Sequence, residues 1–236
     1  MGAALPGGRT AHTRAHYGSD VPAVLLSRLS PAWAGSRALP AEDAVRAAGD
    51  LVAEGRRVDL APRSAGSPAL VAELTGRLTA AGIGAFSEVT VPAVGSMPSA
   101  DVAVALTGPA GDVDRLVALL PGARVVVDAT APESADRCRR LAGRRVRLVS
   151  SGRGAAADLA FVRCLSVLMA GDGEPAVATT DPRLIAVAGE RAAWNGRPPE
   201  SWEYVMPWGA PTEEQHRLVA AGHPVRVQVP VAGGRA

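Results

Sequence analysis

Residues 146–185 decide the fold of this 236-residue chain; they read VRLVSSGRGAAADLAFVRCLSVLMAGDGEPAVATTDPRLI. A short apolar run at 146–149 is followed by a helical pattern over 159–170, which a Gly-Asp-Gly sequence ends. A second apolar run at 176–178 leads into another helical pattern, with Asp181 placed to cap it. A strand, a helix and a second strand at this spacing predict a parallel βαβ unit.

The same alternation extends outward on both sides of this unit. Eight short apolar runs predict strands at 58–60, 89–91, 102–106, 125–127, 146–149, 176–178, 202–206 and 225–229. Helical patterns with capping residues at their ends lie at 41–54, 69–81, 113–120, 133–141, 159–170, 183–194 and 213–221. Eight strands alternating with helices predict an α/β fold, a (β/α)8 TIM-type barrel. A doubly wound open sheet is the alternative, although no glycine-rich dinucleotide turn follows the first strand.

Two places depart from a complete barrel and predict a distorted, incomplete one. Only six residues separate Val94 from Asp101, whereas a parallel crossover needs about a dozen or more. We therefore expect no helix between strands 2 and 3: they pair antiparallel, or one leaves the barrel, or the barrel is damaged. The chain stops soon after the eighth strand, so we expect no final helix either. Residues 1–37 are expected to be a flexible leader, which leaves 38–236 as the barrel.

Composition excludes several classes of function. All 25 residues counted as Lys+Arg are arginine, which excludes lysine Schiff-base chemistry. The net charge is only +2 and aromatic residues make up 3%, so we expect no nucleic-acid partner. The arginine-rich segment 137–147 is interpreted as a solvated helix face.

The sequence also predicts where the protein is located, the state of its cysteines and whether it has a metal site. No apolar run approaches the roughly 18 residues of a membrane span, and no signal-peptide pattern is present, so we expect a cytoplasmic protein. Cys138 and Cys164 are expected to be buried, reduced thiols. None of the histidines has neighbours at metal-ligand spacing, so we expect no metal site.

In a barrel, functional side chains gather at the C-terminal ends of the strands. Those ends carry two carboxylates here, Asp128 and Asp181, and no histidine, which is a poor set for acid–base chemistry. Asp181 precedes a proline and is therefore interpreted as a helix N-cap. The loop 150–154 either cradles a phosphate through its backbone N–H groups or is a plain loop.

Residues 158–185, 202–209 and 214–230 resemble the proline dehydrogenases of the monofunctional bacterial type. The resemblance covers most of the chain, from the first predicted helix to the last strand. Members of that family are distorted (β/α)8 barrels that bind FAD and oxidise L-proline to pyrroline-5-carboxylate by hydride transfer to the flavin. The resemblance therefore implies an FAD-dependent flavoprotein oxidoreductase of proline catabolism. It implies cofactor contacts at Asp128, Arg147, Gly152, Thr179 and Glu203.

The family's substrate-handling residues are replaced here. Its second-strand lysine, sixth-strand histidine and last-strand tyrosine correspond to Pro92, Thr180 and Gln228. An acidic motif of the third strand corresponds to residues 106–109, which carry no charge, and the helix with paired arginines has no counterpart. Binding the carboxylate of an amino acid requires cationic side chains such as that lysine and those arginines, which together form a cation clamp.

We therefore predict a proline dehydrogenase-like protein that lacks the parent activity, a pseudoenzyme. It would act as a module that binds a small-molecule ligand, a second copy of itself or a protein partner. Two alternatives stay open. One is an active flavoprotein with altered substrate specificity, and the other is a parent activity that partner chains complete.

Overall fold

The computed structural model describes residues 37–63, 67–93 and 102–233. The predicted leader, apart from Arg37, lies outside these residues. Within the described residues, no helix is long and apolar enough to cross a membrane.

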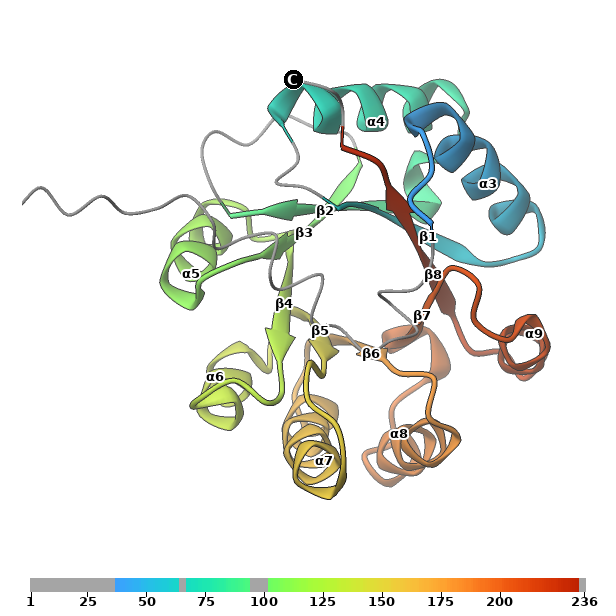
Figure 1. Cartoon of the computed structure of the whole chain (residues 1–236). Helices are drawn as coiled ribbons and strands as arrows, with labels where there is room; N and C mark the ends of the chain where they lie inside the picture. Colours follow the sequence, from blue (N-terminus) through green and yellow to red (C-terminus); the bar gives the residue numbers. More distant parts are fainter. Residues whose placement is uncertain (1–36, 64–66, 94–101, 234–236) are drawn as a thin grey trace, which may run out of the picture.

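Eight parallel strands form a closed barrel in which each strand pairs with its neighbours along the chain and β8 pairs with β1. Figure 1 shows the barrel from one end, with the helices arranged around it. The strands are β1 (Arg57–Pro62), β2 (Ser87–Pro92), β3 (Ala103–Thr107), β4 (Arg124–Asp128), β5 (Arg145–Val149), β6 (Glu174–Ala178), β7 (Glu203–Pro207) and β8 (Val225–Val231). The predicted strand alternation and the TIM-type barrel are confirmed.

The helices follow the predicted pattern closely. They are α3 (Ala41–Ala53), α4 (Pro68–Ala80), α5 (Ala110–Leu119), α6 (Ser134–Leu141), α7 (Ala155–Ala170), α8 (Pro182–Trp194) and α9 (Thr212–Ala220), with short 3-10 helices at Gly84–Phe86 and Pro199–Ser201. Asp181 caps α8 as predicted, because its carboxylate accepts the backbone N–H of Arg183 at 2.8 Å. Helix α7 begins earlier than predicted, and Asp158 lies in its first turn rather than before it.

The expected failure of pairing between strands 2 and 3 is wrong. Strands β2 and β3 pair in parallel, in register from Glu88 opposite Ala103 to Pro92 opposite Thr107. The ten residues 93–102 can extend over about 33 Å, and a five-residue strand is about 17 Å long. Ten residues are therefore long enough to lead the chain back along one strand, and a parallel connection of this length requires no helix. Residues 94–101 themselves lie outside the described part of the chain.

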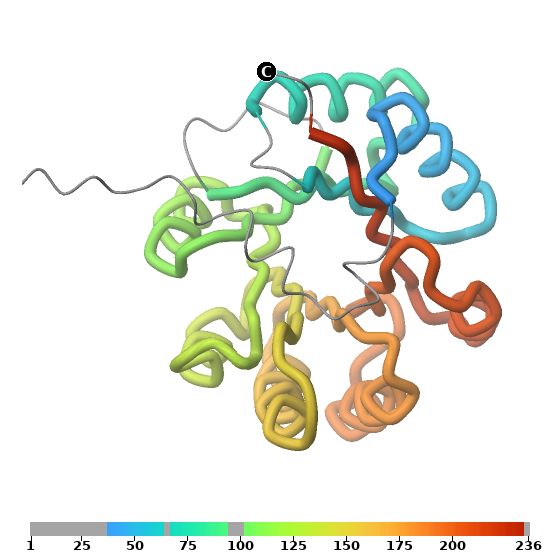
Figure 2. Tube along the Cα trace, in the orientation of Figure 1, coloured from blue at the N-terminus to red at the C-terminus, as the bar shows by residue number. Residues whose placement is uncertain are grey.

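Helix α3 covers the seam between β1 and β8, although it precedes β1 in the chain. It packs on both strands, and its buried residues Ala44, Ala48 and Leu51 lie on one face. The segment before it joins the end of β8: the Leu39 N–H donates to the Pro230 carbonyl at 2.9 Å. Figure 2 shows these two ends of the described chain side by side. No helix follows β8 in the described residues, and α3 covers the position that such a helix would take.

Two layers of side chains fill the structure. Outward-facing strand residues pack under the helices in one extensive apolar core. Cys138 and Cys164 lie within it as free, buried thiols, as predicted. Inside the barrel, the apolar part is a small patch on β4–β7, formed by Val126, Val149, Ala176, Ala178 and Val205. The remaining interior is largely polar and charged.

Candidate functional site

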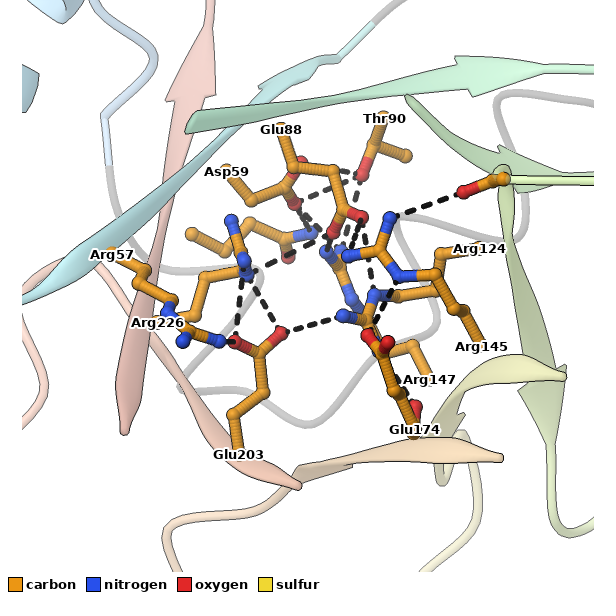
Figure 3. Close-up of polar contacts among 12 residues, drawn as sticks. Arg57, Asp59, Glu88, Thr90, Arg124, Arg145, Arg147, Glu174, Glu203 and Arg226 are labelled. Atoms are coloured by element: carbon orange, nitrogen blue, oxygen red, sulfur yellow. Dashed lines mark hydrogen bonds and ion pairs between the residues drawn. The ribbon is translucent and has the colours of Figure 1, made fainter. Parts of the chain in front are cut away.

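Charged side chains occupy the inside of the barrel, because alternate residues of each strand point inward. Figure 3 shows them converging from strands on opposite sides. We call the buried members the interior charge network; they are Asp59, Glu88, Thr90, Arg124, Arg147, Glu203, Arg226 and Gln228. They come from β1, β2, β4, β5, β7 and β8.

Glu203 is the centre of the half of the network near the N-terminal ends of the strands. Its Oε1 accepts from Nε of Arg226 at 2.8 Å and lies 2.9 Å from Nη2 of Arg124. Its Oε2 accepts from Nη1 of Arg57 at 3.0 Å. Arg124 also donates from Nε to Glu88 at 3.1 Å, which links β7 through β4 to β2. One carboxylate therefore holds three guanidinium groups.

Arg147 joins this half to a second group of side chains further along the barrel. It donates to Glu88 through Nη2 and to Asp59 through Nη1, the latter at 2.6 Å. Asp59 also accepts from the Thr90 hydroxyl at 2.8 Å and from Nε2 of Gln228 at 2.6 Å. Four strands are thereby tied to one another across the barrel axis.

The network is electrically balanced. Its fully buried charges are the carboxylates Asp59, Glu88 and Glu203 and the guanidiniums Arg124, Arg147 and Arg226. Burial by itself raises the pKa of Glu203, but Arg226 and Arg124 outweigh it and hold that pKa at about 2. Burial likewise raises the pKa of Glu88, and the surrounding arginines lower it well below its usual range. Neither glutamate is therefore poised to exchange protons near neutral pH.

The interpretation of segment 137–147 as a solvated helix face is wrong at its end. Arg145 and Arg147 belong to β5, and Arg147 is buried inside the barrel. Sequence reasoning also missed Asp59, Glu88 and Arg124 as interior residues. A signal exists for Asp59, which stands between valine and leucine inside the predicted strand 58–60, because a barrel strand has no solvated face; Glu88 and Arg124 lie just before the predicted strands 89–91 and 125–127.

At the C-terminal rim, Asp128 fastens the loops after β4 and β5 together. Its Oδ1 accepts the N–H of Thr130 at 2.9 Å, the Thr130 hydroxyl at 2.8 Å and the N–H of Ser151 at 3.2 Å, and its Oδ2 accepts the Ser151 hydroxyl. Gly152 is packed in the same place, because a Cβ there would lie 2.8 Å from Cγ2 of Thr130. Asp128 and Gly152 therefore stabilise the packing of these two loops against each other.

A cleft of about 260 Å³ opens beside these loops, between the first turns of α7 and α8. We call it the rim cleft. Its lining includes Gly152, Arg153, Asp158, Thr179, Asp181 and Arg183. The helix N-termini and arginines favour an anion there, but Arg183 already pairs with Asp181 at 2.6 Å and with Asp158 at 3.4 Å. The hydrogen bond from Arg183 lowers the pKa of Asp181.

The five residues that the resemblance assigns to the cofactor are therefore distributed over three places. Gly152 and Thr179 meet at the rim cleft, Asp128 ends β4 and binds the adjoining loops, and Arg147 and Glu203 lie in the interior charge network. In the described residues, no group of three or more His, Cys, Asp and Glu side chains could hold a metal ion.

The rim cleft by itself is too small for a complete FAD molecule. Pockets for drug-sized ligands usually measure about 300–1,000 Å³, and the rim cleft is smaller, at about 260 Å³. Arg147, Glu203 and Asp128 make their polar contacts with other parts of the chain. The cleft suits a group of phosphate size, and no reaction step through a flavin follows from this geometry.

Comparison with known proteins finds solved structures with a similar fold. No protein-family profile matches the chain, and no curated protein sequence matches it. Solved structures of proline utilization A (PutA) are similar. The protein from Bdellovibrio bacteriovorus, inactivated by N-propargylglycine, has a TM-score of 0.64 and 13% identity over 89% of this chain and 31% of its own. The protein from Corynebacterium freiburgense has a TM-score of 0.59 and 15% identity over 90% of this chain and 30% of its own.

A mutant PutA from Bradyrhizobium japonicum has a TM-score of 0.54 and 17% identity over 75% of this chain and 26% of its own. At such identities the similarity shows the fold alone. The chain spans less than a third of the length of these proteins.

Proposed function

We propose that this chain is a proline dehydrogenase-like barrel, over residues 38–236, that lacks proline-oxidising activity and serves as a cytoplasmic binding module. The sequence resemblance and the likeness to PutA structures support the relationship. The observation that carries the loss of activity is the interior charge network. Each of its three buried guanidiniums already pairs with carboxylates of this chain, so binding a substrate carboxylate would require breaking a buried ion pair.

The inward positions nearest the mouth support the same conclusion. By strand alternation four of them are Pro92, Thr107, Pro207 and Pro230, which are uncharged, and a fifth, Asp128, carries a negative charge. Gln228, which lies where the resemblance places a tyrosine over the substrate, donates instead to Asp59. A zwitterionic substrate would find no cation clamp among these side chains.

The test is the visible absorbance of the chain after gel filtration in the presence of FAD, followed by an assay of proline-dependent dye reduction. We expect a folded, colourless protein without dye reduction. A yellow protein with stoichiometric flavin that reduces the dye when proline is added would overturn the proposal.

The rim cleft favours one alternative, an active flavoprotein of altered specificity. Gly152 and Thr179 meet there beside Arg153 and the start of α7, a suitable setting for one phosphate of a dinucleotide. This alternative expects bound flavin that Arg153→Ala weakens and no dye reduction with proline. A parent activity completed by partner chains would appear as proline-dependent dye reduction only in a complex.

A further inference from the structure

A larger cavity lies outside the barrel, between α3 and α9, with a volume of about 460 Å³. We call it the interhelical cavity. Val227 of β8 is one of its apolar lining residues, together with Leu51 of α3 and Trp208 of the loop before α9. Its volume falls within the roughly 300–1,000 Å³ of small-molecule sites. None of its lining residues belongs to the rim cleft.

Arg56 is the positive group of this cavity. Only 5% of it is exposed, and its Nη1 donates to Oε1 of the buried Gln215 at 2.7 Å. Its Nη2 pairs with Glu54, yet its Nε is buried and, in the part of the chain that the structure describes, has no hydrogen-bond partner. Glu54 is 51% exposed and also contacts His216. Its carboxylate can therefore turn toward solvent and leave the guanidinium to an incoming carboxylate.

Asp50 is the negative group. It is exposed, lines the cavity, and makes no side-chain hydrogen bond or ion pair with any described residue. It precedes Glu54 by four residues, and such positions lie side by side at the end of a helix. Because Arg56 contacts Glu54, the unpaired carboxylate of Asp50 lies about one helical turn from a guanidinium whose carboxylate partner is itself exposed.

This pattern selects one class of ligand. Asp50 and Glu54 repel a simple anion. A simple cation can pair with Asp50, but it supplies no acceptor for the buried guanidinium of Arg56. The apolar lining favours a hydrocarbon body. We propose that the interhelical cavity binds a small apolar zwitterion, an α-amino acid with a hydrocarbon side chain. Its ammonium pairs with Asp50, its carboxylate replaces Glu54 on Arg56, and its side chain lies against Leu51, Val227 and Trp208.

The first test titrates L-leucine into the 236-residue chain and follows the indole N–H resonance of Trp208 in a heteronuclear NMR spectrum. We expect a saturable shift of that resonance. Two analogues remove one charge each: 4-methylpentanoate lacks the ammonium and 3-methylbutylamine lacks the carboxylate. Each should bind about tenfold more weakly or worse, because a charge-assisted hydrogen bond is lost.

The second test changes the protein. Asp50→Asn should weaken leucine binding by about tenfold, whereas Asp43→Asn, on the same helix and paired with Arg46, should leave it unchanged. Asp50 is exposed, so both variants should fold. The proposal fails if leucine does not shift the Trp208 resonance saturably, if either analogue binds as well as leucine, or if Asp50→Asn binds as the parent does. These outcomes are independent of whether the barrel binds flavin.

Discussion

Replacing Arg147 by methionine removes one cation from the interior charge network while nearly preserving side-chain length. Asp59 and Glu88 each lose a partner that donates to them inside the barrel. Removing one member of a buried ion pair costs about 3–5 kcal/mol, because a charge is left uncompensated away from water. A chain of this size loses about 2–4 °C of melting temperature per kcal/mol. We therefore expect Arg147→Met to melt roughly 6–20 °C lower than the parent.

The assay is urea and thermal unfolding, followed by circular dichroism at pH 8. Arg183→Met is the matched control, because Arg183 is 76% exposed and its pairs with Asp181 and Asp158 lie at the surface. It should change stability by less than about 1 kcal/mol.

Rescue provides the decisive comparison. Asp59→Asn, added to Arg147→Met, removes the carboxylate that has lost its ion-pair partner and should recover most of the lost stability, whereas Glu88 keeps its pair with Arg124. Loss of less than about 1 kcal/mol in the single variant, or no recovery on adding Asp59→Asn, would refute the account of the network as a set of obligatory buried pairs.

Three further predictions concern the same fold. Burial raises the pKa of Glu203 but its arginine partners lower it to about 2, so its ion pairs stabilise the protein above about pH 4.3 and are lost as pH falls toward 2. Glu203→Gln should therefore flatten the dependence of urea-unfolding free energy on pH over that interval, and an unchanged slope would contradict the assignment. Gly173→Ala would place a Cβ against the backbone of Arg144 and should cost roughly 1–3 kcal/mol in calorimetry; wild-type stability would show that the backbone yields easily. Asp181→Ala removes the cap of α8 and should cost about 1 kcal/mol in thermal melting, with Asp181→Asn close to the parent.

Much of the architecture could be predicted because the responsible signals are local. The Val-Arg-Leu-Val sequence of β5 and the Asp-Pro sequence that opens α8 each indicate their element without reference to the rest of the chain. Pairing was harder to predict. The short connection between β2 and β3 led to the wrong expectation, because the length rule describes crossovers that contain a helix, whereas ten extended residues already exceed the length of a five-residue strand.

The candidate site was less predictable because it depends on which side chains meet. Nothing in the sequence around Arg147 indicates that its partners are Asp59, 88 residues away, and Glu88. Asp128 and Gly152 are suited by type to a ligand site, and the structure instead uses them to hold two loops together. Position in a barrel shows where ligands can bind; side-chain partners decide whether a given group is free to bind one.

The seam that α3 covers has a consequence for synthesis on the ribosome. Strand β1 emerges early, but its partner across the seam is β8, and Arg226 reaches the Val58 carbonyl across 168 residues of sequence. At about 5–20 residues per second, translation of that interval takes roughly 8–35 s. Throughout it the nascent barrel has two open edges, and Asp59 lacks Arg147 until β5 appears and Gln228 until β8 does. The barrel therefore closes late in synthesis. Until then, its exposed strand edges can bind chaperones or aggregate with other chains.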